Sequence, residues 1–132
     1  MQRRQFIELS AVGGTVFLVT GLNCRQRHTE LYDVLGQPEQ LAQICDLKTL
    51  REIGMDYRMK TSAEMESGKL AELLLSDSTG RVSSTADQSL VLSLMRRKTT
   101  EDFETGNIVE VKGWILSVTE ARQCALLYVN NP

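Results

Sequence analysis

Histidine and aromatic residues are scarce in this chain of 132 residues. It contains one histidine, and phenylalanine, tryptophan and tyrosine together make up 5% of the sequence. Histidine is the usual partner of a serine or cysteine nucleophile, so neither a Ser-His-Asp nor a Cys-His arrangement is expected. The shortage of aromatic side chains also leaves no platform on which bases or sugars could stack.

Positive charge is not in excess either. The chain carries 15 Lys and Arg against 17 Asp and Glu, and no basic patch indicates binding to nucleic acid, so we expect none. No G-x-G-x-x-G or G-K-[ST] sequence indicates a phosphate-binding loop. Carboxylates are plentiful, but they fall on polar helix faces or near helix starts, where they are usually solvated. We therefore expect no catalytic activity from the chain alone.

Cysteine occurs three times, at Cys24, Cys45 and Cys124. The wide spacing excludes a C-x-x-C pair and with it the common zinc, iron–sulfur and haem motifs, so we expect no metal or cofactor in this chain. In an oxidising compartment Cys45 and Cys124 could form a disulfide. Both also lie in apolar helical contexts, where a free cysteine is an ordinary small core residue. The sequence leaves both alternatives open.

The N-terminal segment has the layout of a bacterial twin-arginine export signal. Arg3 and Arg4 precede Phe6, and a weakly apolar run follows over residues 11–22. A helix of about 12 residues would be roughly 18 Å long, against about 30 Å for the hydrocarbon core of a membrane. We therefore interpret residues 1–23 as an export signal or an N-terminal anchor, read by the twin-arginine translocase.

The fate of this segment after export stays open. Cys24 stands where a lipoprotein would be lipidated, but Asn23 before it is bulkier than such sites usually have, and no small-x-small cleavage site is obvious. Cleavage, lipidation at Cys24 and retention as an anchor are the alternatives. We expect a periplasmic protein associated with the inner membrane, and lipidation or retention would attach it there through its N-terminus. Residues 24–132 suffice for one small domain.

The fold class expected for residues 24–132 is mainly α. Apolar spacing and capping residues predict about five to six helices, with a short hairpin-like β segment before the last one. The expected helices are a short one ended by Gly36, one over 38–45, one of about 14 residues capped by Asp46, one beginning at a Thr61-x-x-Glu64 capping box, one over about 85–104, and one capped by Ser117. Lys112-Gly113 is expected to turn the hairpin.

A family resemblance is carried by two stretches, residues 41–58 and 102–126. The second contains G-W-I-L-S-V-T-E-A-R from Gly113 to Arg122. Both resemble the small-subunit family (subunit 3) of gluconate 2-dehydrogenase and related sugar dehydrogenases. The resemblance implies a helical accessory subunit that accompanies a large glucose-methanol-choline type flavoprotein. It also implies FAD in that partner and, often, a cytochrome c subunit.

The resemblance and the export signal agree, because the twin-arginine route carries folded proteins, often with a cofactor already inserted. A chain without cofactor ligands would use it as the escort of a cofactor-bearing partner. The residues expected at that interface are Trp114, Ile115, Leu116 and Arg122, with Trp114 serving either there or as a core anchor. The alternatives are a stand-alone periplasmic lipoprotein or anchored binding module and, less favoured, a small hydrolase or isomerase using carboxylates.

Overall fold

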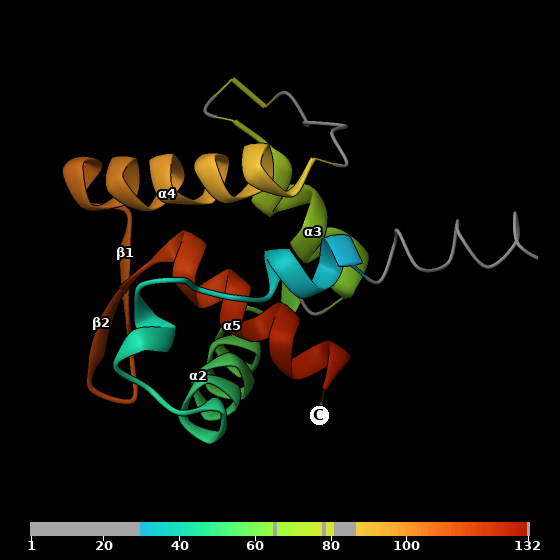
Figure 1. Ribbon diagram of the computed structural model, residues 1–132. Helices are drawn as coiled ribbons and strands as arrows, with labels where there is room; N and C mark the ends of the chain where they lie inside the picture. Colours follow the sequence, from blue (N-terminus) through green and yellow to red (C-terminus); the bar gives the residue numbers. More distant parts are fainter. Residues whose placement is uncertain (1–29, 65, 78, 81–86, 132) are drawn as a thin grey trace, which may run out of the picture. The chain divides into compact units, whose positions relative to one another are not determined.

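Helix α5 (Val118–Asn130) is the element against which the rest of the domain packs. The computed structural model describes residues 30–64, 66–77, 79–80 and 87–131 (Figure 1). Within that part, α5 contacts both strands and three helices, which are α2 (Leu47–Lys60), α3 (Ser67–Leu75) and α4 (Gln88–Thr105). The described chain is mainly helical, with an antiparallel hairpin directly before the last helix, which confirms the expected fold class.

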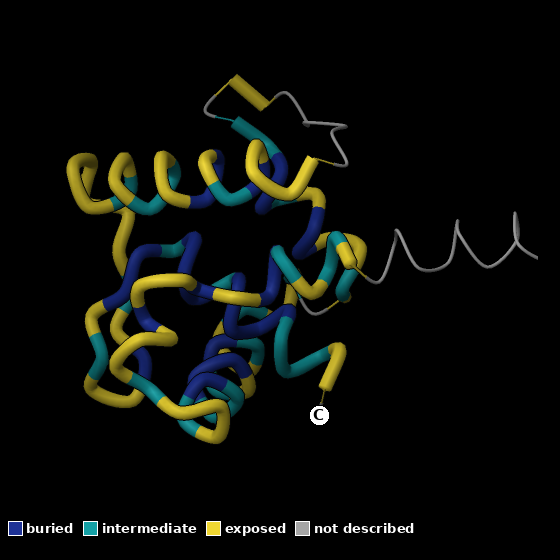
Figure 2. Tube along the Cα trace, in the orientation of Figure 1, coloured by how far each residue is buried: buried dark blue, intermediate teal, exposed yellow. Residues whose placement is uncertain are grey.

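The expected capping box at the start of α5 is confirmed. The Glu120 N–H donates to Ser117 Oγ, and the Ser117 N–H donates back to Glu120 Oε2, both over 3.0 Å. Two amides at the helix start are therefore satisfied locally. Most of the first two turns of α5 is buried, including the polar residues Thr119, Glu120 and Gln123 (Figure 2).

Helix α2 has the predicted length of 14 residues and the predicted cap. Asp46 Oδ1 accepts the N–H of Thr49 over 2.8 Å. Hydrogen bonds from the side chain and the backbone of Thr49 lower the pKa of the Asp46 carboxyl. Leu50, Ile53, Gly54 and Tyr57 form its buried face, as the spacing indicated. Leu47 shares the helical spacing of this face but is 51% exposed, because it lies at the edge of the face in the first turn.

The hairpin joins β1 (Ile108–Val111) to β2 (Trp114–Ser117), and Val111 pairs with Trp114 across the turn. Lys112 and Gly113 have φ values of 51° and 82°, which fit a two-residue hairpin turn and confirm the expected one. Side chains alternate between two faces. Trp114 and Leu116 face the core with Val109 and Val111, and Ile108 and Ile115 face outward.

Two expectations are wrong, which are the helix over residues 38–45 and the start of the helix expected from Thr61. Over residues 38–45 the chain forms only a 3-10 turn, Leu41–Gln43, and Ile44 is 71% exposed rather than buried. So short a segment, followed at once by the cap of α2, has little room to nucleate an α-helix. Thr61 and Glu64 form no capping box: the Thr61 hydroxyl donates to the carbonyl of Tyr57, and Glu64 bonds elsewhere. A 3-10 turn, Ser62–Glu64, and then α3 follow.

The remaining helix ends agree with the sequence to within a few residues. Residues 30–35 are helical and Gly36 follows, with its N–H donating to the Tyr32 carbonyl. Asp87 caps α4, which begins at Gln88 rather than near residue 85, and Gly106 ends it with φ 74°. None of the helices in the described ranges is long and apolar enough to cross a membrane.

Candidate functional site

Asp102 of α4 ties that helix to the start of α5. Its Oδ2 accepts the Thr119 N–H over 2.8 Å and the Thr119 hydroxyl over 2.7 Å, and its Oδ1 accepts the Asn107 side chain over 3.0 Å. A carboxylate at a helix N-terminus is favoured by the helix dipole and by the unpaired amides there. Asp102 therefore acts as a second cap for α5, supplied from another helix.

Arg122 forms a two-point ion pair with Glu64. Its Nε and Nη2 donate to the two carboxylate oxygens over 3.1 and 3.0 Å, and the Tyr57 hydroxyl donates to Glu64 Oε2 over 2.9 Å. The side chains of Arg122 and Glu64 are only 21% and 19% exposed. A two-point pair of this kind holds both groups in one geometry, so it fixes the segment before α3 onto α5.

These contacts shift the pKa values of Tyr57 and Glu64. Burial and the hydrogen bond to Glu64 raise the pKa of Tyr57 to about 12. Burial alone would raise the pKa of the Glu64 carboxyl, but the hydrogen bonds from Arg122 and Tyr57 outweigh it and leave this pKa lowered. Both pKa shifts favour an ionised Glu64 carboxylate that accepts hydrogen bonds from the neutral Tyr57 phenol and from the Arg122 guanidinium.

Lys98 of α4 is the other cation near this cluster. Its Nζ donates to the carbonyls of Leu73 and Leu74 over 2.6 and 2.8 Å. These carbonyls lie at the C-terminal end of α3, where a cation is favoured by the helix dipole. Burial, and then the charge of Arg122, lower the pKa of the amine to about 8.

A polar pocket of about 350 Å³ lies over these groups, with Lys98, Asp102, Thr119 and Arg122 among its lining residues. Each of the four already bonds a partner within the domain. The described residues contain no group of three His, Cys, Asp or Glu side chains placed to hold a metal. The arrangement joins α3, α4 and α5, and every charged member has a structural partner.

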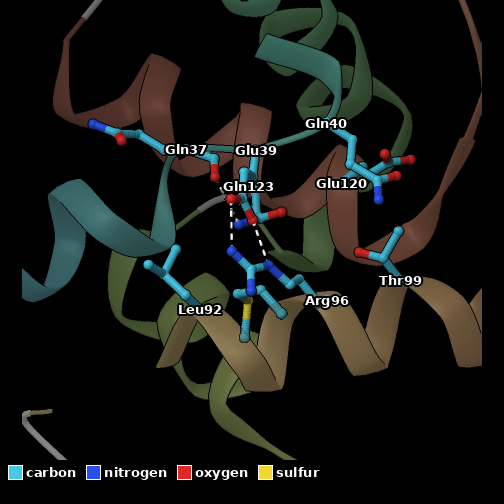
Figure 3. A pocket seen from close by; sticks show the side chains of 9 residues that line it. Gln37, Glu39, Gln40, Leu92, Arg96, Thr99, Glu120 and Gln123 are labelled. Carbon is cyan, nitrogen blue, oxygen red and sulfur yellow. Dashed lines mark hydrogen bonds and ion pairs between the residues drawn. The ribbon is translucent and has the colours of Figure 1, made fainter. Parts of the chain in front are cut away.

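A second ion pair closes a smaller cavity on the opposite edge of α4. Arg96 Nε and Nη2 donate to the Glu39 carboxylate over 2.6 and 2.7 Å, as Figure 3 shows. The cavity behind this pair is about 20 Å³ and is bordered by Gln37, Glu120 and Gln123. Such a volume is too small for an organic ligand. The pair therefore fastens the segment before α2 to α4.

An apolar groove of about 530 Å³ begins on the other side of Glu39. Its lining is mostly apolar and comes from the segment before α2, from α2, from α4 and from α5, with Ala42, Cys45, Leu47, Leu50, Leu92 and Leu127 as the apolar members. The volume lies in the range of binding pockets. This groove is larger than the polar pocket at Lys98 and the small cavity behind Arg96.

The four residues expected at a partner interface do not share one surface. Leu116 is buried, and Arg122 is held by Glu64. Trp114 is partly buried and packs against the core from the inner face of the hairpin. Ile115, on the outer face, is 65% exposed. The G-W-I-L-S-V-T-E-A-R segment is therefore mainly a structural one, which turns the hairpin and starts α5.

Cys45 and Cys124 are both free thiols in this structure. Cys45 is partly buried at the groove, and Cys124 is fully buried in α5. Burial raises the pKa of each thiol, with the charge of Asp46 adding to the shift at Cys45. The other predicted site residues, Arg3, Arg4, Phe6 and Cys24, lie outside the described residues.

Sequence reasoning missed the long-range pairs of the domain. Glu64 was assigned to a local cap, although it bonds Arg122 from 58 residues away. Glu39 and Arg96 gave no local signal at all, because they lie 57 residues apart and both belong to polar segments. Asp102 lies inside the stretch that carries the resemblance, but its bond to Thr119 is not encoded in any spacing.

Comparison with family models, curated proteins and solved structures finds no match to the chain.

Proposed function

We propose that this chain is a non-catalytic small subunit that escorts and stabilises a cofactor-bearing dehydrogenase through the twin-arginine export route. The partner is a large flavoprotein that holds FAD and oxidises a sugar or an alcohol, and a cytochrome c subunit is a further member of the complex. The complex works in the periplasm at the inner membrane. Support comes from Arg3, Arg4 and Phe6 in the N-terminal segment and from the resemblance of residues 41–58 and 102–126 to such subunits.

One observation carries the proposal of a binding rather than a catalytic role. The charged side chains around the start of α5 are directed to internal partners, whereas large apolar side chains stay exposed on a small domain. Those exposed by more than 45% are Ile44, Leu47, Met59, Leu90, Phe103, Ile108 and Ile115. Among them Ile108 and Ile115 share the outer face of the hairpin, and exposed apolar side chains gathered on one face are typical of sites that bind another macromolecule.

Co-purification tests the proposal. The tagged full-length chain, expressed together with its neighbouring genes, is purified from membranes and its partners are identified and quantified. We expect a large protein in equal amount, with the absorption spectrum of a bound flavin. A chain that is exported and purified without any flavoprotein would refute the proposal.

The export step has its own control. Replacing Arg3 and Arg4 with Lys keeps the charge but removes the planar guanidinium groups. We expect both the chain and its flavoprotein to stay in the cytoplasm, still bound to each other. If the double variant and its partner reach the periplasm at the wild-type level, the export role is refuted.

The apolar groove favours a second candidate, a stand-alone binding module attached to the membrane. A volume of about 530 Å³ with mostly apolar lining could hold a small apolar ligand. In that case the chain is purified alone, and native mass spectrometry shows a small molecule bound to it. Substitution of Leu92 by Glu at the groove should then remove that molecule.

A further inference from the structure

Helix α2 carries a cationic face on a domain that is otherwise acidic. It contains Lys48, Arg51, Arg58 and Lys60 against Glu52 and Asp56, whereas the other described residues include 6 Lys and Arg and 14 Asp and Glu. A local excess of one sign on a surface of the opposite sign orients a charged partner before contact. This asymmetry marks α2 as a candidate docking element.

The charges of α2 are sorted around the helix. At about 100° per residue, a sector of about 120° holds six residues and no carboxylate. This sector is called the basic face below, and its members are Leu47, Lys48, Arg51, Met55, Arg58 and Met59. Glu52 falls about 20° outside it and Asp56 about 60° outside it. Asp56 pairs with Lys60 over 3.5 Å.

The basic face combines exposed apolar side chains with cations. Leu47, Met55 and Met59 are 51%, 37% and 69% exposed. Neither Lys48, which is exposed, nor Arg51, which is partly buried, forms an ion pair with a described residue. The Nε of Arg51 is itself buried and has no hydrogen-bond partner in the described part of the chain. Arg58 lies 5.6 Å from the centre of the Tyr128 ring. Exposed methionines adapt readily to a partner surface.

The apolar groove continues this face. Leu47 lines the groove and also begins the basic face, so the two form one surface. The groove is concave, and Ala42, Leu92 and Leu127 form its walls. A protein segment can place side chains into such a hollow, whereas a flat bilayer cannot fill it. The acidic remainder of the domain would also be repelled by anionic lipid.

We propose that the basic face and the groove together bind an acidic, amphipathic helical segment of a partner protein. The apolar side of that segment fills the groove and covers Leu47, and its carboxylates meet Lys48 and Arg51. This mode of recognition is the helix-in-groove mode. The inference deepens the proposed function, because it names the surface of this chain that the partner protein contacts. It rests on the proposed function only in supposing that a protein partner exists.

The experiment uses defined probes and the full-length chain. The first probe is a fluorescent peptide of about 18 residues with Leu on one helical face and Glu on the others. The second is the same peptide with Lys in place of Glu, and the third is vesicles of phosphatidylcholine and phosphatidylglycerol. We expect the acidic peptide to bind at least about tenfold more tightly than the basic one, and added salt to weaken it.

Charge reversal locates the site. Lys48→Glu with Arg51→Glu should weaken binding of the acidic peptide at least about tenfold, because opposite charges become like charges. Lys69→Glu with Lys112→Glu makes the same change of charge on exposed residues of α3 and the hairpin turn, and should alter binding less than about twofold. Met59→Ser tests the apolar part and should also weaken binding. Thermal unfolding checks that each variant is folded.

The outcomes separate this inference from the proposed function. Equal binding of both peptides, no binding of the acidic one, or equal loss in the two reversal pairs would overturn the inference. Vesicle binding that is lost with Lys48→Glu and Arg51→Glu but kept with Lys69→Glu and Lys112→Glu, without binding of the acidic peptide, would overturn it in favour of a lipid surface. Vesicle binding through the N-terminal segment would be the same in both reversal pairs. None of these results depends on a dehydrogenase, whose presence is decided by the co-purification experiment.

Discussion

Gly54 of α2 lies directly against the backbone of Cys124 in α5. A Cβ atom added at Gly54 would lie 2.0 Å from the Cys124 carbonyl oxygen and 2.5 Å from its carbonyl carbon. The backbone nitrogen of Ala125 would lie 2.9 Å from the same Cβ, so the contact is possible only because glycine has no side chain. The two central helices therefore pack backbone to backbone at this point.

Gly54→Ala should destabilise the domain, although alanine is the better helix former by about 1 kcal/mol. The added methyl group would meet main-chain atoms that cannot rotate away, so the helices must separate. We expect a net loss of at least about 2 kcal/mol in the free energy of unfolding, measured by urea denaturation. Gly68→Ala in α3, where nothing lies within 4 Å of the new methyl group, is the matched control and should be neutral or stabilising.

Local features of the fold were predictable because their signals lie within a few residues. Asp46 before α2, Gly106 after α4, the Lys112-Gly113 turn and the Ser117 capping box each depend on neighbours in the chain. The close packing at Gly54 could also be anticipated, since a glycine inside an amphipathic helix otherwise only weakens it.

The polar cluster could not be predicted in the same way. The Thr61-x-x-Glu64 pattern matches a capping box, but the Glu64 carboxylate gains a two-point contact with Arg122 and a bond from Tyr57 instead. Such competition between a local and a distant partner is decided by tertiary packing. The same holds for Leu47, whose spacing indicated burial and whose position at the helix edge leaves it exposed.

Asp102→Ala should uncouple α4 from α5. The substitution leaves the Thr119 N–H without its acceptor, and a buried unsatisfied donor costs about 1–3 kcal/mol. We expect a loss of that size in the free energy of unfolding. Asp102→Asn keeps one acceptor oxygen and should cost less. If both variants unfold at the wild-type denaturant concentration, Asp102 is not a cap of α5.

Tyr57 should make the domain sensitive to alkali. Its pKa is about 12 in the folded chain against 10.0 for the free side chain, so the folded state holds the proton longer. Stability from this group is complete below pH 10 and is lost as pH rises from 10 to 12. Unfolding measured over this range should show a steeper loss for the wild type than for Tyr57→Phe. If the stability of the wild type and of Tyr57→Phe falls equally steeply with pH, the raised pKa of Tyr57 is contradicted.

Titration of Lys98 should raise the stability of the domain with increasing pH, whereas titration of Tyr57 lowers it, and the Lys98 effect should begin at lower pH. Its pKa is about 8 in the folded chain against 10.5 for the free amine, so the unfolded state binds more protons between these values. The contribution of Lys98 to stability should therefore rise as pH increases from 8 to 10.5. Lys98→Arg stays charged throughout, so the difference in stability between wild type and variant should grow over this range. A constant difference would show that Lys98 does not titrate there.

Trp114 and Ile115 are neighbours on opposite faces of the hairpin, so their substitution separates packing from recognition. Trp114 packs against the core, and Trp114→Ala should cost about 2–4 kcal/mol, somewhat less than for a fully buried tryptophan. Ile115 is 65% exposed, and Ile115→Ala should change stability by less than about 0.5 kcal/mol.

The functional comparison of these two variants follows from that difference. If the outer face of the hairpin belongs to the interface with a partner, Ile115→Ala should reduce co-purification while the melting temperature stays at the wild-type value. Trp114→Ala should lower both together, because it disturbs the fold that presents the face. Unchanged co-purification of a folded Ile115→Ala variant would remove the hairpin from the interface and leave the basic face of α2 as the surface to test.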